Sequence, residues 1–175
     1  QANERYDQEA LLPLVAAGAN QNTEIATATQ GLFKQLLTKY KVLVSAGNGY
    51  EFAMALAGKA MESSLKEIKL QALQLFGALV EKGQGYTQAI VVASKGVESK
   101  EKEVCDNACK LFTVLFAKGE GYAEAITAAI KVVRAPADDI DTGYLGARET
   151  NALALLDVLF EKGHGYEQGL KAAVA

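Results

Sequence analysis

Tryptophan is absent from this chain of 175 residues, histidine occurs once, and proline, cysteine and methionine occur twice each. The shortage of proline and the abundance of alanine favour helices and disfavour disordered or β-rich structure. The net charge of −3 lacks the basic excess that binds phosphates, so we expect no nucleic-acid partner. No apolar run is long enough to span a bilayer.

The scarce cysteines and histidine restrict the chemistry of the chain. Cys105 and Cys109 lie four residues apart in a helical stretch, where a disulfide would be at the edge of acceptable geometry, so we interpret them as small apolar core residues. A metal site would need further ligands, and His164 is the only histidine. Because no nucleophile has both a histidine and an acid available, we expect no enzyme activity, no metal and no cofactor.

A motif of four residues, Gly-x-Gly-Tyr, occurs four times. The copies span 47–50, 83–86, 119–122 and 163–166, at spacings of 36, 36 and 44 residues. A fixed period of this size is typical of repeat proteins, in which each unit buries its apolar face against its neighbours. The motif therefore predicts a single helical-repeat domain over 1–175.

Apolar residues at intervals of three and four predict a long helix before each motif and a shorter helix after it. We expect long helices over about 24–46, 64–82, 99–118 and 144–162, and short ones over about 51–61, 87–97, 123–134 and from 167 to the end. Ser64 and Glu67 form a capping-box pattern at the start of the second long helix. The repeats then span about 23–62, 63–98, 99–134 and 135–175, after a degenerate N-terminal element, 1–22, with a helical stretch at 7–17.

Alignment on the first glycine of each motif predicts the buried face of the long helices. All four repeats carry leucine four residues before it and an apolar residue three before it, which are Leu43 and Val44 in the first repeat. Three repeats also share large apolar residues seven and eight before it and alanine eleven before it, and these positions together form one stripe. These positions are Leu79, Leu115, Leu159; Leu75, Phe76, Leu111, Phe112, Leu155, Leu156; and Ala72, Ala108, Ala152. On the first long helix, the three-and-four spacing selects Ile25, Ala28, Leu32, Leu36, Tyr40 and Leu43.

The glycines of the motif fit a helical hairpin turn. The first occupies the left-handed position just after a helix, and the second permits the reversal. We expect the motif tyrosines to cover the elbow, with a tyrosine ladder for binding as the alternative. A dinucleotide loop is disfavoured because these glycines follow helices and not strands. The acidic stretch with Asp138, Asp139 and Asp141 lacks the other ligands of a calcium loop.

Three short helices carry a lysine nine residues after the tyrosine: Lys59, Lys95 and Lys131. In stacked repeats, equivalent positions lie in register, so these lysines would form a ladder. A solvated stripe is the simpler interpretation. The functional alternative is an electropositive strip that faces an acidic segment of a partner protein.

The units of 36 to 44 residues resemble the HEAT and armadillo class of α-solenoids. The resemblance covers about residues 24–175 and rests on the pattern Leu-[Val/Phe]-x-[Lys/Ala]-Gly-x-Gly-Tyr-x-x-[Ala/Gly], which is not the standard motif of either family. It implies an all-α fold, a right-handed α-solenoid of about four stacked antiparallel helix pairs, with a concave surface that binds a protein or peptide. The expected function is a protein-interaction scaffold. The alternative is a non-catalytic targeting or regulatory region of a larger enzyme or secreted bacterial effector.

The two ends of the chain carry separate expectations. Gln1 is not followed by a signal-peptide pattern, so the compartment stays open, with the cytoplasm favoured over export. Residues 169–175 are mostly apolar, although a solenoid normally ends on a polar face. We expect that the chain belongs to a longer array; the alternative is end-to-end self-association through the C-terminal repeat.

Overall fold

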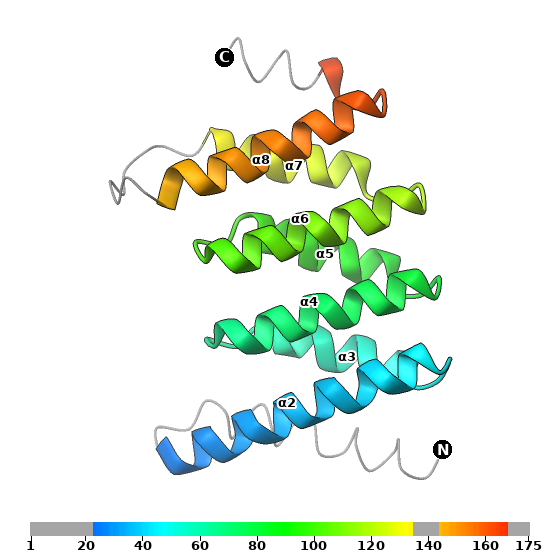
Figure 1. Ribbon diagram of the computed structural model, residues 1–175, viewed down its shortest axis with the longest axis vertical. Helices are drawn as coiled ribbons and strands as arrows, with labels where there is room; N and C mark the ends of the chain where they lie inside the picture. Colours follow the sequence, from blue (N-terminus) through cyan, green and yellow to red (C-terminus); the bar gives the residue numbers. More distant parts are fainter. Residues whose placement is uncertain (1–22, 135–143, 168–175) are drawn as a thin grey trace. The chain divides into compact units, whose positions relative to one another are not determined.

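The computed structural model describes residues 23–134 and 144–167, and this described part is all-helical, with seven α-helices and no strand (Figure 1). The predicted helix at 7–17, the acidic loop at 135–143 and the last short helix beyond Glu167 lie outside the described residues. The long helices are α2 (Thr23–Ser45), α4 (Lys66–Glu81), α6 (Lys102–Ala117) and α8 (Tyr144–Glu161); the short ones are α3 (Tyr50–Ala60), α5 (Tyr86–Val97) and α7 (Tyr122–Val133). The predicted alternation of long and short helices is confirmed.

The helices fall into two compact units, unit 1 (Gln1–Gly85) and unit 2 (Tyr86–Ala175). In unit 1, α2 and α4 pack against each other and both contact α3. In unit 2, α6 packs against α8 and α5 against α7, while α5 contacts α6 and α7 contacts α8. Within each unit the long helices form one layer and the short helices lie behind them in Figure 1. The arrangement of packed neighbouring helices is compatible with a helical repeat architecture.

The predicted apolar stripe forms the core of α4, α6 and α8. The three alanines eleven residues before the first glycine are fully buried, which lets neighbouring helices approach closely. The leucines four residues before that glycine are also fully buried, and the residues seven and eight before it are at most 8% exposed. Alignment of the repeats on the glycine therefore identified the core of these three helices correctly.

On α2 the predicted stripe is correct only in part. Tyr40 and Val44 are fully buried as predicted, but Leu32 is 49% exposed, and Phe33 and Leu37 are buried in its place. Lys39 occupies the position where the other long helices carry a buried leucine, and a lysine keeps its charged end in water. Before Tyr40, the buried face of α2 is therefore displaced by one residue from the expected stripe.

The start of α4 also differs from the prediction. Its N-cap is Leu65, which has no capping side chain, so the capping box of Ser64 and Glu67 is not formed. Instead, the Ser63 hydroxyl accepts a hydrogen bond from the backbone N–H of Leu65 at 3.1 Å. Ser99 does the same for Glu101 at 3.2 Å, before α6. These serines therefore order the turn that precedes the helix and do not cap its first residues.

In the last three motifs, the second glycine contacts a residue of the preceding short helix. Both glycines of every motif have positive φ, between 69° and 88°. A Cβ on the second glycine would lie 3.0 Å from Met54 Sδ at Gly85, 3.2 Å from Ile90 Cγ1 at Gly121, and 2.6 Å from Ile126 Cδ1 at Gly165. Met54, Ile90 and Ile126 occupy equivalent positions of α3, α5 and α7. Each of these three residues therefore packs against the glycine of the next motif, inside one unit.

Candidate functional site

The three predicted lysines end the three short helices. Lys59, Lys95 and Lys131 lie in the last turns of α3, α5 and α7, and all three are exposed. Lys59 belongs to unit 1, whereas Lys95 and Lys131 occupy equivalent positions of two neighbouring helices in unit 2. The structure therefore brings the lysines of α5 and α7 onto one surface.

Two of the lysines are neutralised by glutamates that follow the short helices. Lys59 Nζ lies 3.2 Å from Glu62 Oε2, and Lys131 forms an ion pair with Glu98. Lys95 makes no ion pair with any residue in 23–134 or 144–167. In each unit, a glutamate thus accompanies a lysine, and the short-helix surface is less positive than the lysine spacing predicts. The glutamates, three residues after Lys59 and Lys95, were visible in the sequence and were missed.

The surface around Lys95 carries small and partly apolar side chains. One turn before each lysine, the short helices expose Ala55, Val91 and Thr127, and the Val91 side chain is 50% exposed. Val133 near the end of α7 is 40% exposed. We call Val91, Lys95, Thr127 and Lys131 the short-helix face of unit 2. Small residues between cations let a partner backbone approach the helices closely.

Tyr122 covers the turn of its motif, as predicted. The Tyr122 hydroxyl donates a hydrogen bond to the carbonyl of Phe116 at 2.9 Å, and its ring stacks on Phe116 with 4.9 Å between centroids. The exposed His164 ring stacks on the other side of Tyr122 at 3.8 Å. Tyr166 stacks on Phe160 and stays 57% exposed. The tyrosine at the first of these two turns is therefore a structural cover, whereas Tyr166 also offers an accessible ring.

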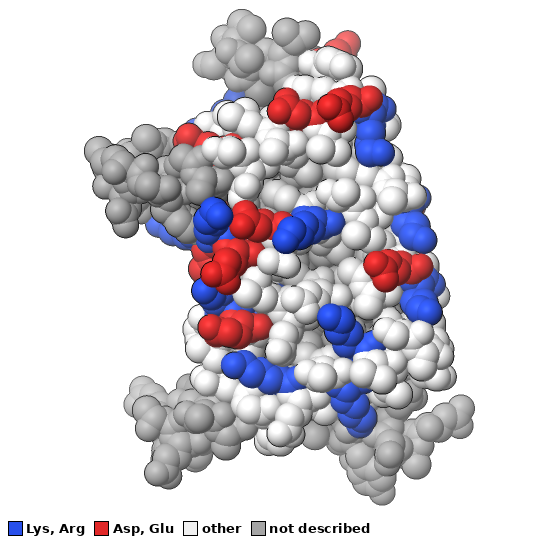
Figure 2. Space-filling view, in the orientation of Figure 1, with Lys and Arg blue, Asp and Glu red and all other residues white. Residues whose placement is uncertain are grey.

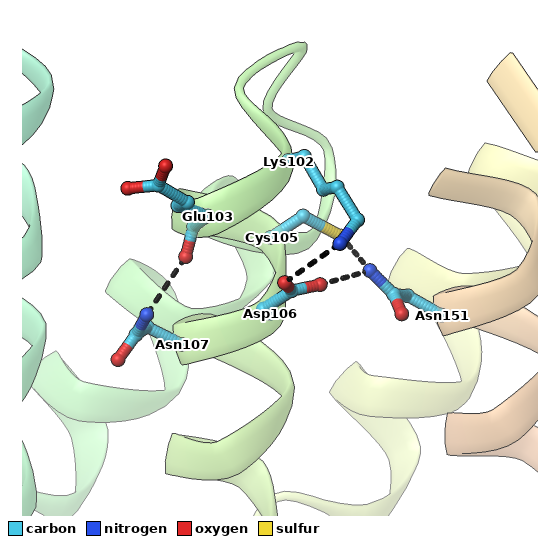
Figure 3. A network of polar contacts seen from close by, with 6 residues as sticks. All are labelled: Lys102, Glu103, Cys105, Asp106, Asn107 and Asn151. Carbon is cyan, nitrogen blue, oxygen red and sulfur yellow. Dashed lines mark hydrogen bonds and ion pairs between the residues drawn. The ribbon is translucent and has the colours of Figure 1, made fainter. Parts of the chain in front are cut away.

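A polar network joins the long helices α6 and α8 (Figure 3). The side-chain amide of Asn151 donates hydrogen bonds to Asp106 Oδ1 and to Cys105 Sγ, the latter at 3.8 Å. Asp106 also pairs with Lys102 at 3.6 Å. Both cysteines are free thiols: Cys105 is buried and donates to the Val97 carbonyl at 3.5 Å, while Cys109 lies 4.0 Å from the Asn151 carbonyl. The network fixes the register of α6 against α8 and holds no arrangement of nucleophile, base and acid.

The Cys109 thiol is expected to react slowly. A hydrogen bond with the Cys105 side chain and burial raise the pKa of the Cys109 thiol above its usual range. Because the thiolate is the nucleophile, carbamidomethylation by iodoacetamide at about pH 8 should be at least about tenfold slower in the folded chain than in urea. Since the unfolded thiol loses its proton first, the free energy of unfolding should fall as pH rises past about 8.5.

Mass spectrometry of tryptic peptides at successive times measures this rate. Both cysteines lie in the tryptic peptide 103–110, so fragmentation of this peptide assigns the label to Cys105 or Cys109. Equal labelling rates in buffer and in urea would contradict the buried, hydrogen-bonded state of this thiol.

An amide side chain occupies the same position in all four long helices. Gln35, Gln71, Asn107 and Asn151 each lie twelve residues before the first glycine of a motif, a regularity that sequence reasoning missed. Their environments differ: Gln35 is exposed, the buried Oε1 of Gln71 has no hydrogen-bond partner among described residues, and Asn107 donates to the Glu103 carbonyl at 2.8 Å. Within unit 2, Asn151 links two helices, whereas Asn107 bonds within its own helix.

The remaining surface gives no single-sign charge field. Figure 2 shows basic and acidic side chains interspersed on the long-helix side of each unit. In the described ranges, no three His, Cys, Asp or Glu side chains gather where they could hold a metal ion. Over the same ranges, none of the helices combines the length and the apolar character needed to cross a membrane.

Comparison of the chain with protein families, with curated proteins and with solved structures finds no match. The described part is therefore characterised by its architecture: an all-helical protein of packed neighbouring helices that fits a helical repeat.

Proposed function

We propose that this chain is a protein–protein interaction module without catalysis of its own, built as a right-handed α-solenoid of about four HEAT/armadillo-like repeats. The observation that carries the proposal is the repetition of one exposed pattern on equivalent short helices, with a small residue at 55, 91 and 127 and a lysine at 59, 95 and 131. Repeat proteins bind partners along such regular surfaces. The partner is another protein or peptide that contributes acidic side chains.

The core and the surface of the repeats support this assignment in different ways. Equivalent apolar positions are buried at 0–8% exposure in α4, α6 and α8, so the sequence repeat serves packing there. The lysines do not serve packing, because they are exposed at the ends of the short helices. A repeated feature that the core does not require is the signature expected of a binding surface.

Charge reversal tests the proposal. Changing Lys59, Lys95 and Lys131 together to Glu should reduce the partner protein retained by the immobilised chain about tenfold or more, because three repulsive contacts replace attractive or neutral ones. The matched control changes Lys82, Lys118 and Lys162, which follow the long helices, to Glu. This control alters net charge equally and should leave retention within about twofold.

The readout is the amount of each protein retained from a native extract, quantified by mass spectrometry, with the helical content of each variant checked by circular dichroism. Unchanged retention in the short-helix triple variant would exclude this surface. Equal losses in both triple variants would indicate nonspecific charge attraction in place of a defined interface.

A further inference from the structure

Val91 and Lys95 form the most accessible mixed surface in the short-helix face of unit 2. They lie four residues apart on α5, one turn from each other, so both project from the same side of the helix. Val91 is 50% exposed. An exposed valine alone carries little information, but here it adjoins an ammonium group that no described carboxylate neutralises.

The neighbouring charges make Lys95 different from the other two lysines. A partner carboxylate at Lys59 must compete with Glu62, and one at Lys131 must compete with Glu98. Glu98 is also the acidic residue nearest in sequence to Lys95, three positions along the chain, and it is engaged by Lys131 from α7. The cation of Lys95 is therefore available to an incoming carboxylate without the loss of an existing pair.

The spacing of the two side chains limits the shape of the partner. Residues four apart on a helix have Cβ atoms about 5–6 Å apart. In an extended chain, alternate residues lie on one face about 6.6 Å apart. A carboxylate and an aliphatic side chain two positions apart on an extended segment can thus meet Lys95 and Val91 together, and small Thr127 on α7 leaves room for the backbone.

We propose that Val91 and Lys95 anchor an extended segment of a partner protein in which an acidic and an aliphatic residue alternate with one residue between them. This inference rests on the proposed function, and it names the chemistry of the partner. It further assigns the dominant contact to one of the three lysines.

Fluorescence anisotropy with two labelled synthetic peptides tests the inference on the full chain. The first peptide repeats Glu-Ser-Leu-Ser three times, which places acidic and aliphatic side chains on one face of an extended chain. The second repeats Glu-Leu-Ser-Ser three times and has the same composition and charge, but places them on opposite faces. We expect the first peptide to bind at least about fivefold more tightly.

Variants of the chain identify the anchor. Lys95→Met removes the charge and keeps the aliphatic stem, and Val91→Ser removes the apolar contact; each should raise the Kd of the first peptide about fivefold. Lys59→Met is the matched control, and should change the Kd less than about twofold, because Lys59 belongs to unit 1 and is already paired with Glu62. Raised salt should weaken binding to the wild-type chain more than to Lys95→Met.

Three results of the peptide assay would overturn the inference: no binding of the first peptide up to about 1 mM, equal affinity for both peptides, or equal effects of Lys95→Met and Lys59→Met. These outcomes are distinct from failure of the proposed function. If lysine reversal still abolishes capture of a protein but the peptides do not bind, the module stands and the Val91–Lys95 anchor is wrong. Concentration-dependent sedimentation of the chain, abolished by Val91→Ser, would identify a second copy as the occupant and also overturn the inference.

Discussion

Gly165→Ala is expected to lower the free energy of unfolding by about 2–5 kcal/mol, the sum of a left-handed backbone cost and a steric cost. Gly165 has a φ of +82°, and an added Cβ would lie 2.6 Å from Ile126 Cδ1 and 2.9 Å from Ile126 Cγ1. Ile126 is only 5% exposed, and its β-branched side chain has few alternative rotamers. The clash therefore cannot be relieved without disturbing the core between α7 and the turn.

Gly163→Ala is the matched control, since Gly163 has a φ of +80° and no heavy atom within 4 Å of the added Cβ. It should cost only the backbone term, about 1–2 kcal/mol. Urea denaturation followed by circular dichroism measures both variants. Ile126→Val in the Gly165→Ala background removes the nearest atom and should recover part of the steric loss; identical losses for the two alanine variants would refute the contact.

Leu37→Ala is expected to lower the free energy of unfolding by about 2–5 kcal/mol, whereas Leu32→Ala should lower it by less than about 1 kcal/mol. Both leucines are on α2, but Leu37 is 2% exposed and Leu32 is 49% exposed. The same atoms are deleted from the same helix, so intrinsic helix propensity contributes equally to the two variants. The difference reports burial alone.

Urea midpoints and m-values of the two α2 variants provide the measurement. The apolar spacing of the sequence predicted Leu32 in the core, and a larger loss for Leu32→Ala than for Leu37→Ala would restore that prediction against the structure.

The helix order and the turns could be predicted because they depend on local chemistry. A glycine with positive φ ends a helix without a Cβ penalty. The first glycine of each motif does so, and the second glycine, also with positive φ, lies just before the tyrosine of the motif. The repeats also provided an internal alignment, so the buried alanines at 72, 108 and 152 could be read from register. Local sequence signals and the alignment of the repeats were together sufficient to predict the buried residues of α4, α6 and α8.

The buried face of α2 needed tertiary information. Two sets of apolar residues on this helix follow a spacing of three and four, one through Leu32 and Leu36 and another through Phe33 and Leu37. Periodicity alone cannot choose between them. The choice depends on the direction of α3 and α4, and on Lys39, whose charge disfavours burial of the first set.

The exposure of the three lysines was predicted from the sequence, but their ion pairs were not. The three lysines lie on exposed short-helix surface, as their spacing indicated. Their pairing depends on side-chain reach: Lys59 pairs along its own chain segment, whereas Lys131 on α7 reaches Glu98, which follows α5. Such contacts join residues 33 positions apart, beyond the range of local patterns. Their effect is to single out Lys95.

The packing of each short-helix residue on the following motif glycine has a consequence for how such a chain can be lengthened or recombined. A segment that begins at the tyrosine of one motif and ends at the second glycine of the following motif, such as 50–85 or 86–121, contains both residues of one contact. The contact is Met54 with Gly85 in the first segment and Ile90 with Gly121 in the second. Duplication of a gene segment with these borders copies both residues of the contact together. Recombination with borders inside such a segment would place a short-helix residue of one repeat against the glycine of another repeat. It would be tolerated only where that side chain fits against the glycine.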